Sequence, residues 1–371
     1  MAFQLKAPVL TENREVKPSP YDPIEASSMQ ESKAIHLQHP ASLPPEKPKV
    51  APATREWGKV RKLALRQLNR FASLEPKVLK GDNPDAIHDM RVASRRLQQV
   101  LDLVYSKPLP REVRRLRCKI RRCRRSLGDV RNCDVLLQRV GSRLARKRCS
   151  GRQAWKAVKQ YLEERRSESF SRAIRKLGKV NLAIFYMRAK ATLDQLIPAP
   201  NQGEDSPPGV QPGGALEPFS AQIAHTLAGV WSEFENQVAV SHREATPAAL
   251  HGARICAKRL RYLLEVVDEF GVSGSSDVLA WLRRIQQHLG DWHDIEILEE
   301  AIIKMIARPE FLRDHLPLAM AAAKLIVRNR ATKQKFKEKY FQMTLDSPDY
   351  QRVKEWIERL LAAPPAVFSG S

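Results

Sequence analysis

Long apolar runs and paired cysteines are both missing from this sequence. No stretch of about 18 apolar residues is present to span a bilayer, and the opening MAFQLKAPVLTENREVK lacks the apolar segment of a secretory signal. We therefore expect a cytoplasmic protein that does not insert into a membrane. None of the five cysteines belongs to a CxxC pair, and an odd number without a signal favours reduced, mostly packed thiols over disulfides or zinc. They are Cys118, Cys123, Cys133, Cys149 and Cys256.

Acidic side chains and aromatic rings are also scarce. The chain carries 64 Lys and Arg residues against 41 Asp and Glu residues, a formal net charge of +23. Such a positive field predicts a polyanionic partner: nucleic acid, an anionic membrane surface or another phosphate polymer. Aromatic residues make up only 6% of the chain, whereas single-strand binders interleave aromatic stacking platforms with their cations. Helix-turn-helix and zinc-finger spacings are not evident, so nonspecific nucleic-acid binding stays open as an alternative function.

Strand signals are scarce throughout, and the sequence predicts an all-α fold. Residues 1–54 are rich in Pro, Ser, Lys and Glu, which is typical of a disordered tail. Helical spacing then runs over 55–197 and again over 218–362, with a Pro- and Gly-rich linker loop at 198–217. Residues 363–371 form a short C-terminal tail. The chain therefore consists of two helical regions between tails.

The two helical regions resemble each other in sequence. AIHDMRVASRRLQQVLDLV (86–104) matches ALHGARICAKRLRYLLEVV (249–267) at a constant offset of 163. RRCRRSLGDVRNCDVL (121–136) matches RRIQQHLGDWHDIEIL (283–298) at an offset of 162. Because two separated segments keep their order and spacing, we expect a tandem duplication of a helical unit of about 145 residues.

The excess positive charge belongs to the first copy. Residues 55–197 contain 38 basic and 13 acidic side chains, whereas residues 218–362 contain 20 and 19. If the protein binds a polyanion, the first half is therefore expected to dominate the affinity.

The first matched segment predicts an amphipathic helix with a basic row beside its core seam. The two expected seams are Ile87, Met90, Ser94, Leu97, Leu101 and Val104, and then Leu250, Ala253, Ala257, Leu260, Leu264 and Val267. The candidate binding residues in the rows beside them are His88, Arg91 and Arg95, and then His251, Arg254, Lys258 and Arg261. Seen once, such a row is usually a solvated face. Seen twice without acidic partners, and rich in Arg, whose planar fork suits phosphate, it favours an anion site. For each histidine alone, a hydrogen-bonded boundary residue is the alternative.

The second matched segment adds a strongly cationic helix with its own apolar seam. Its further candidates are Arg114, Arg117, Arg121, Arg122, Arg124 and Arg125, of which the second copy keeps only Arg283 and Arg284. So many like charges on one helix repel each other and are tolerated more easily beside a polyanion. Gly128 and Gly290 are each expected to end a helix in the left-handed conformation, and the aspartate that follows each is expected to cap the next helix.

HDMRVASRRL and HGARICAKRLRYLLE, together with LGDVRNCDVL and LGDWHDIEIL, resemble motifs of the CHAD family, the conserved histidine α-helical domains. The resemblance covers roughly residues 57–360. It implies two helical bundles related by a pseudo-twofold, with a basic groove or channel between them that binds inorganic polyphosphate and brings the protein to polyphosphate granules. By motif position the resemblance also implies ligand contacts from Arg96 and Arg259, beside those in the two rows. It implies no catalytic residue, metal or cofactor. The ExExK signature of the CYTH triphosphatase domain, to which members are often fused, is absent.

A metal-dependent phosphohydrolase is the less favoured alternative. His293 and Asp294 form an HD dipeptide with His288 and Asp291 nearby, and such side chains serve as metal ligands. The signal is weak, because the first copy has a different pair at the same place. We expect Asp294 in the first turn of a helix, where a carboxylate favours the macrodipole. The sequence leaves the oligomeric state open.

Overall fold

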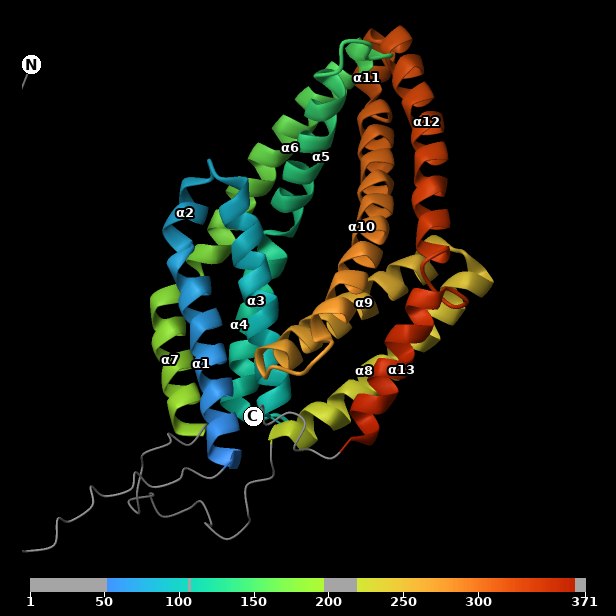
Figure 1. Cartoon of the computed structure of the whole chain (residues 1–371). Helices are drawn as coiled ribbons and strands as arrows, with labels where there is room; N and C mark the ends of the chain where they lie inside the picture. Colours follow the sequence, from blue (N-terminus) through green and yellow to red (C-terminus); the bar gives the residue numbers. More distant parts are fainter. Residues whose placement is uncertain (1–51, 106–107, 197–218, 364–371) are drawn as a thin grey trace, which may run out of the picture. The chain divides into compact units, whose positions relative to one another are not determined.

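A computed structural model of the chain describes residues 52–105, 108–196 and 219–363 (Figure 1). Every regular element in these ranges is an α-helix, which confirms the predicted all-α fold. The first helix already begins at Pro52. Otherwise the predicted N-terminal tail, the linker loop and all but the first residue of the C-terminal tail lie outside the described residues.

The first half forms a group of helices followed by a long hairpin. Its helices are α1 (Pro52–Ser73), α2 (Glu75–Lys80), α3 (Pro84–Val104), α4 (Arg111–Ser126), α5 (Gly128–Leu144), α6 (Arg152–Gly178) and α7 (Leu182–Leu196). Helix α1 packs against α3 and α7, and α3 also packs against α4. Helices α5 and α6 lie side by side as a hairpin (Figure 1).

The second half repeats this order of packing. Its helices are α8 (Phe219–Glu244), α9 (Pro247–Glu269), α10 (Ser275–Ile306), α11 (Pro309–Asp314), α12 (Leu316–Phe341) and α13 (Pro348–Ala362). Helix α8 packs against α9 as α1 packs against α3, and α10 packs against α12 as α5 packs against α6 (Figure 1). The tandem duplication stays a prediction from the sequence.

The matched helices α3 and α9 have clear start signals and buried seams. The Asn83 side chain accepts hydrogen bonds from the backbone N–H groups of Asp85 and Ala86 at 2.9 and 3.1 Å, and Thr246 caps α9 in the same manner through Ala249 at 3.2 Å. All twelve predicted seam residues of the two helices are buried, which confirms both seams. Burial of the seam fixes which face of each helix carries the basic row.

The two glycines of the second matched segment do not have the predicted conformation. Neither Gly128 nor Gly290 has a positive φ, and Gly290 lies inside the continuous helix α10. Buried Leu289 and Trp292 flank it, so packing outweighs the modest helix cost of a glycine. The predicted caps are also wrong: Asp129 lies in the first turn of α5, but the N-cap position is Leu127 and no side chain caps the helix, and Asp291 lies inside α10. Asp294 lies in the middle of α10, so its predicted first-turn position is wrong.

The described part of the chain folds around apolar cores that draw on both halves. The Trp57 ring of α1 packs edge-on against Phe219 of α8, with the ring centroids 5.1 Å apart. A smaller cluster joins the hairpins α5–α6 and α10–α12. All five cysteines are free thiols, and three of them are buried. None of the helices described is long and apolar enough to cross a bilayer.

Gly81 is a position where the fold requires glycine, and it provides a stability test. Its φ is +75°, and an added Cβ would lie 2.3 Å from the Phe170 ring. We expect Gly81→Ala to lower the free energy of unfolding by about 2 kcal/mol or more, because left-handed strain and overpacking add. Chemical denaturation measures the loss. The matched control is Gly229→Ala, inside α8 with nothing near the new Cβ, which should be neutral or stabilising by up to about 1 kcal/mol. Equal effects of the two substitutions would contradict this account.

Candidate functional site

The basic rows of the two matched helices meet in one pocket. Helix α3 packs against α9, and a pocket of about 410 Å³ opens where α3, α4 and α9 come together. We call it the central pocket; it is lined by Arg95, Gln98, Gln99, Asp102, Arg124, His251, Arg254, Ile255, Lys258, Arg259 and Tyr262. Six of these residues are Arg, Lys or His, and a single one is acidic. That carboxylate, Asp102, is engaged by Arg117, whose Nε lies 2.6 Å from Oδ1.

Hydrogen bonds to neutral groups hold two of the arginines at the pocket. Arg91 donates from Nη1 to the backbone carbonyl of Arg124. Arg124 in turn donates from Nη1 to Oε1 of Gln98 at 2.9 Å. A Cβ at Gly128 would lie 3.5 Å from Nη1 of Arg91, an ordinary van der Waals contact, so the position of this guanidinium does not require a glycine there. Because their partners are neutral, both arginines keep their full positive charge.

The cations at the pocket perturb one another. Burial, followed by the nearby charge of Arg95, lowers the pKa of both Arg91 and Arg124 to about 10, so both remain protonated at neutral pH. Burial, followed by the charges of Arg254 and Arg95, lowers the pKa of Lys258 to about 6. In the free protein Lys258 is therefore largely neutral at pH 7 and above. Arg95 lies close enough to act on cations of both halves.

The two matched histidines lie at the exposed edge of this cluster. The pKa of His88 is lowered by partial burial and by the charge of Arg131. The pKa of His251 is lowered by partial burial, then by Arg254 and Lys258. Both imidazoles are therefore expected to be neutral at physiological pH until an anion arrives.

Helix α10 brings two further residues to the cluster, His293 and Asp294, which form the HD dipeptide of the sequence. Burial and the charge of Arg254 lower the pKa of His293 to about 3, and its ring centroid lies 5.3 Å from that of His251. Burial raises the pKa of Asp294, against the opposing effect of Arg254. Among the residues that the structure describes, no three His, Cys, Asp or Glu side chains are grouped as metal ligands would be.

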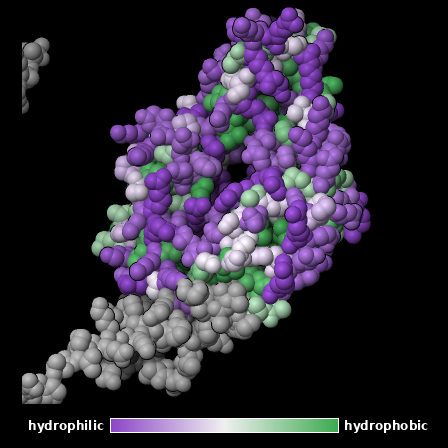
Figure 2. All heavy atoms as spheres, in the orientation of Figure 1, coloured by the Kyte–Doolittle hydropathy of each residue, from purple (hydrophilic) through white to green (hydrophobic). Residues whose placement is uncertain are grey.

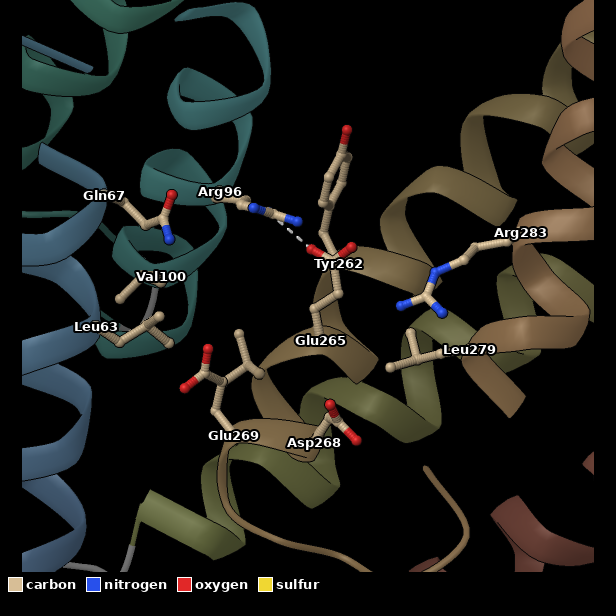
Figure 3. A pocket seen from close by; sticks show the side chains of 11 residues that line it. Leu63, Gln67, Arg96, Val100, Tyr262, Glu265, Asp268, Glu269, Leu279 and Arg283 are labelled. Carbon is tan, nitrogen blue, oxygen red and sulfur yellow. Dashed lines mark hydrogen bonds and ion pairs between the residues drawn. The ribbon is translucent and has the colours of Figure 1, made fainter. Parts of the chain in front are cut away.

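Several predicted binding residues lie instead at a second, acidic pocket of about 210 Å³ (Figure 3). Arg96 donates from Nε to Glu265 at 2.9 Å. Arg261 lies 3.8 Å from the same carboxylate and stacks over the Tyr262 ring at 4.9 Å. Arg283 also lines this pocket, beside the acidic side chains of Glu265, Asp268 and Glu269. These carboxylates make the second pocket a poor place for a polyanion.

The remaining candidates lie outside the central pocket or have acidic partners. Arg259 lines the pocket but forms an ion pair with Glu233. Arg284 pairs with Asp349 at 3.1 Å. The other predicted residues of α4 are exposed: Arg114, Arg121, Arg122 and Arg125. Arg121 and Arg125 are near enough to Arg124 to lower its pKa, so they extend the positive field beyond the pocket.

Sequence reasoning did not single out Gln98, Tyr262 and Arg131. Gln98 and Tyr262 lie on the matched helices near the basic rows. Because their side chains are uncharged, the sequence gives no sign that they belong to an anion site. Arg131 does carry a signal, because it occupies the position in the first copy that His293 occupies in the second.

Comparisons with known proteins agree with this architecture. The CHAD domain family model matches residues 62–302. The crystal structure of the CHAD domain from the plant Ricinus communis is similar at 20% identity and a TM-score of 0.53, covering 83% of this chain and 92% of that one. PptA from Streptomyces chartreusis is similar at 15% identity and a TM-score of 0.53, covering 81% and 99%. A comparison with curated protein sequences found no match. The match of the family model to more than half of the sequence shows that this chain belongs to the CHAD domain family.

Proposed function

We propose that this protein binds inorganic polyphosphate in the central pocket, without catalysing a reaction on it, and that this binding recruits it to polyphosphate granules. The observation that carries the proposal is the convergence of Arg95, Arg124, Arg254 and Lys258 from α3, α4 and α9 on one pocket. Among the described residues, none of the four forms an ion pair with a carboxylate within 4.0 Å. Membership of the CHAD family, which is linked to polyphosphate binding in general, supports the same ligand.

The electrostatics of the pocket explain why a polyanion fits it. Like charges brought together and partly buried raise the free energy of the unliganded protein. A chain of phosphates places one negative charge after another along its length and can relieve several of these repulsions at once. The guanidinium groups supply planar, paired donors for phosphate oxygens. Figure 2 shows that hydrophilic side chains cover most of the visible face, with apolar areas small and separate.

The first half is expected to contribute more of the affinity. Its Arg91, Arg95 and Arg124 have no acidic partner among the described residues, and α4 adds exposed arginines nearby. In the second half Arg254 is the corresponding cation without an ion-pair partner among the described residues, and Lys258 joins it when an anion or a lower pH favours its protonated form. The proposal includes the basic groove or channel expected between the two halves. Nonspecific nucleic-acid binding is the competing function. Competition of polyphosphate against a bound duplex DNA, in the same buffer, separates the two functions.

Binding of polyphosphate should weaken steeply as salt is added. A polyanion neutralised by several cations releases condensed counterions, and by analogy with single-stranded nucleic acid about six contacts give a log–log slope near −4. Calorimetric titration with polyphosphate over a series of salt concentrations measures the slope, with ATP and duplex DNA titrated in parallel. A slope near zero would contradict the ionic mechanism.

Removal of single charges should distinguish the contribution of the central pocket to the affinity from that of the surrounding arginines. Arg95→Gln is expected to lower the affinity about tenfold, the loss of roughly one charge-assisted hydrogen bond. The matched control is Arg284→Gln, an exposed arginine that already has a carboxylate partner in Asp349, and it should change affinity little. Reversal of Arg121, Arg122, Arg124 and Arg125 to Glu should cost more per charge than reversal of Arg283 and Arg284. Equal losses in folded proteins would rule out the central pocket as the dominant site.

Acidification should tighten binding, and Lys258 should account for much of the change. Cations near it and burial depress its pKa to about 6 in the free protein, whereas a bound polyanion favours the charged form and raises the pKa. The complex then binds more protons than the free protein, so affinity rises as pH falls through the interval between the bound value and about 6.

Lys258→Arg keeps the positive charge at every pH and should flatten this dependence while strengthening binding near pH 8. The double change His88→Gln and His251→Gln should remove the contribution of the imidazoles, whose pKa values are lowered in the same way. Titration calorimetry from pH 6 to about 8 gives both profiles. An unchanged slope in Lys258→Arg would show that this amine does not take up the proton.

A further inference from the structure

A second cationic pocket lies at the turn between α5 and α6, where α12 packs against α6. It has a volume of about 320 Å³, and we call it the turn pocket. It is lined by Arg143, Arg146, Arg148, Cys149, Ser150, Trp155, Leu325, Arg328, Asn329 and Thr332. It shares no residue with the central pocket. Figure 1 shows the hairpin formed by α5 and α6, and the turn pocket lies at its turn.

The charge of the turn pocket is uncompensated. Four of its lining residues are arginines and none is acidic. Within the part of the chain that the structure describes, no carboxylate lies within ion-pair distance of any of the four. Arg328 donates from Nη1 to the Ser150 hydroxyl at 2.8 Å. Burial, and then the charge of Arg146, lowers the pKa of Arg143. Positive groups are thus held together around a cavity without a partner for them.

A buried donor without a partner marks the floor of the same pocket. Asn329 is only 7% exposed, and its Nδ2 has no hydrogen-bond partner. An unpaired buried donor costs roughly 1–3 kcal/mol, so its retention beside four arginines points to an acceptor that arrives from outside.

The start of α6 adds further donors. Gly151 precedes α6 in a left-handed conformation, and no side chain caps the first N–H groups of this 27-residue helix. The opposing carbonyls at the end of α5 are already occupied, because Arg152 donates to the Leu144 and Arg146 oxygens at 3.0 and 2.9 Å. The electrostatic balance at the turn therefore favours an anion.

We propose that the turn pocket binds a compact phosphorylated anion of the size of pyrophosphate, independently of the central pocket. The guanidinium groups of Arg143, Arg146, Arg148 and Arg328 neutralise the phosphate oxygens, and Asn329 supplies its free N–H to one of them. The pocket volume exceeds that of one phosphate group, which suits a diphosphate. Because the two pockets share no residue, this site does not depend on polyphosphate binding at the central pocket.

The Cys149 thiol reports on occupancy, because it lines the turn pocket and is half-buried. The full chain is treated with iodoacetamide at low salt, with and without inorganic pyrophosphate, and alkylation is followed by peptide mass spectrometry. At a pyrophosphate concentration about three times the dissociation constant, alkylation of Cys149 should slow about fourfold by mass action. Exposed Cys118 of α4 is the internal reference, and its rate should not change.

Variants assign the protection to named residues. Arg146→Gln with Arg328→Gln should abolish it, and Asn329→Leu, which fills the site without a donor, should weaken it. Arg330→Gln removes an exposed arginine of α12 that does not line the pocket, and it should leave protection intact. Arg254→Gln at the central pocket should also leave it intact, so failure of one site is distinguishable from failure of the other. Absence of protection, or equal loss in Arg330→Gln, would overturn the proposal.

Discussion

Repulsion among like charges at the meeting of α3 and α9 is the constraint on which the rest of this structure depends. Arg95 from one half and Arg254 with Lys258 from the other lie close enough to lower the pKa of the second pair. Such a cluster costs free energy in the absence of a ligand, so the surrounding fold must hold it. The buried seams of α3 and α9 do so, because they fix the rotation of each helix independently of its charged face. Core packing thus holds the like charges together, and under the proposed function a bound polyanion would relieve their repulsion.

Asp294 reduces the repulsion among the cations without lining the central pocket. Its side chain, from the middle of α10, lies near Arg254 and Lys258, and its charge opposes the depression of their pKa values. Burial raises its own pKa, so the carboxylate also carries a desolvation cost. One acid among many cations steadies the cluster but leaves a net positive charge. In the sequence, His293 and Asp294 form an HD dipeptide. A motif of two residues therefore has to be interpreted together with the side chains that pack around it.

The fold and the outline of the site could be predicted from the sequence, whereas the partners of individual charges could not. Every residue that apolar spacing predicted for the seams of α3 and α9 is buried, because a helix buries one face regardless of what lies opposite. The choice of Glu265 as the partner of Arg96, or of Asp349 for Arg284, depends on helices distant in sequence. The predicted helix end at Gly290 is wrong, because the cost of a glycine inside a helix is only about 1 kcal/mol. The packing of α10 outweighs that cost. The burial of Lys258 likewise has no local signal.

Net charge of a whole half is a weak guide to the charge at its site. The second half is almost neutral overall, but several of its acidic residues form ion pairs with particular arginines. Glu233 pairs with Arg259, Glu265 pairs with Arg261 and with Arg96 of the other half, and Asp349 pairs with Arg284. The pairs of Arg259 with Glu233 and of Arg284 with Asp349 are exposed, and each contributes little to stability. Three of the four arginines lie outside the lining of the central pocket, whereas Arg259 lines it and is paired with Glu233. Within the described residues, no carboxylate lies within ion-pair distance of Arg254 or Lys258, although the charge of Asp294 acts on both. A half that is nearly neutral overall can therefore still place basic groups without ion-pair partners at a pocket.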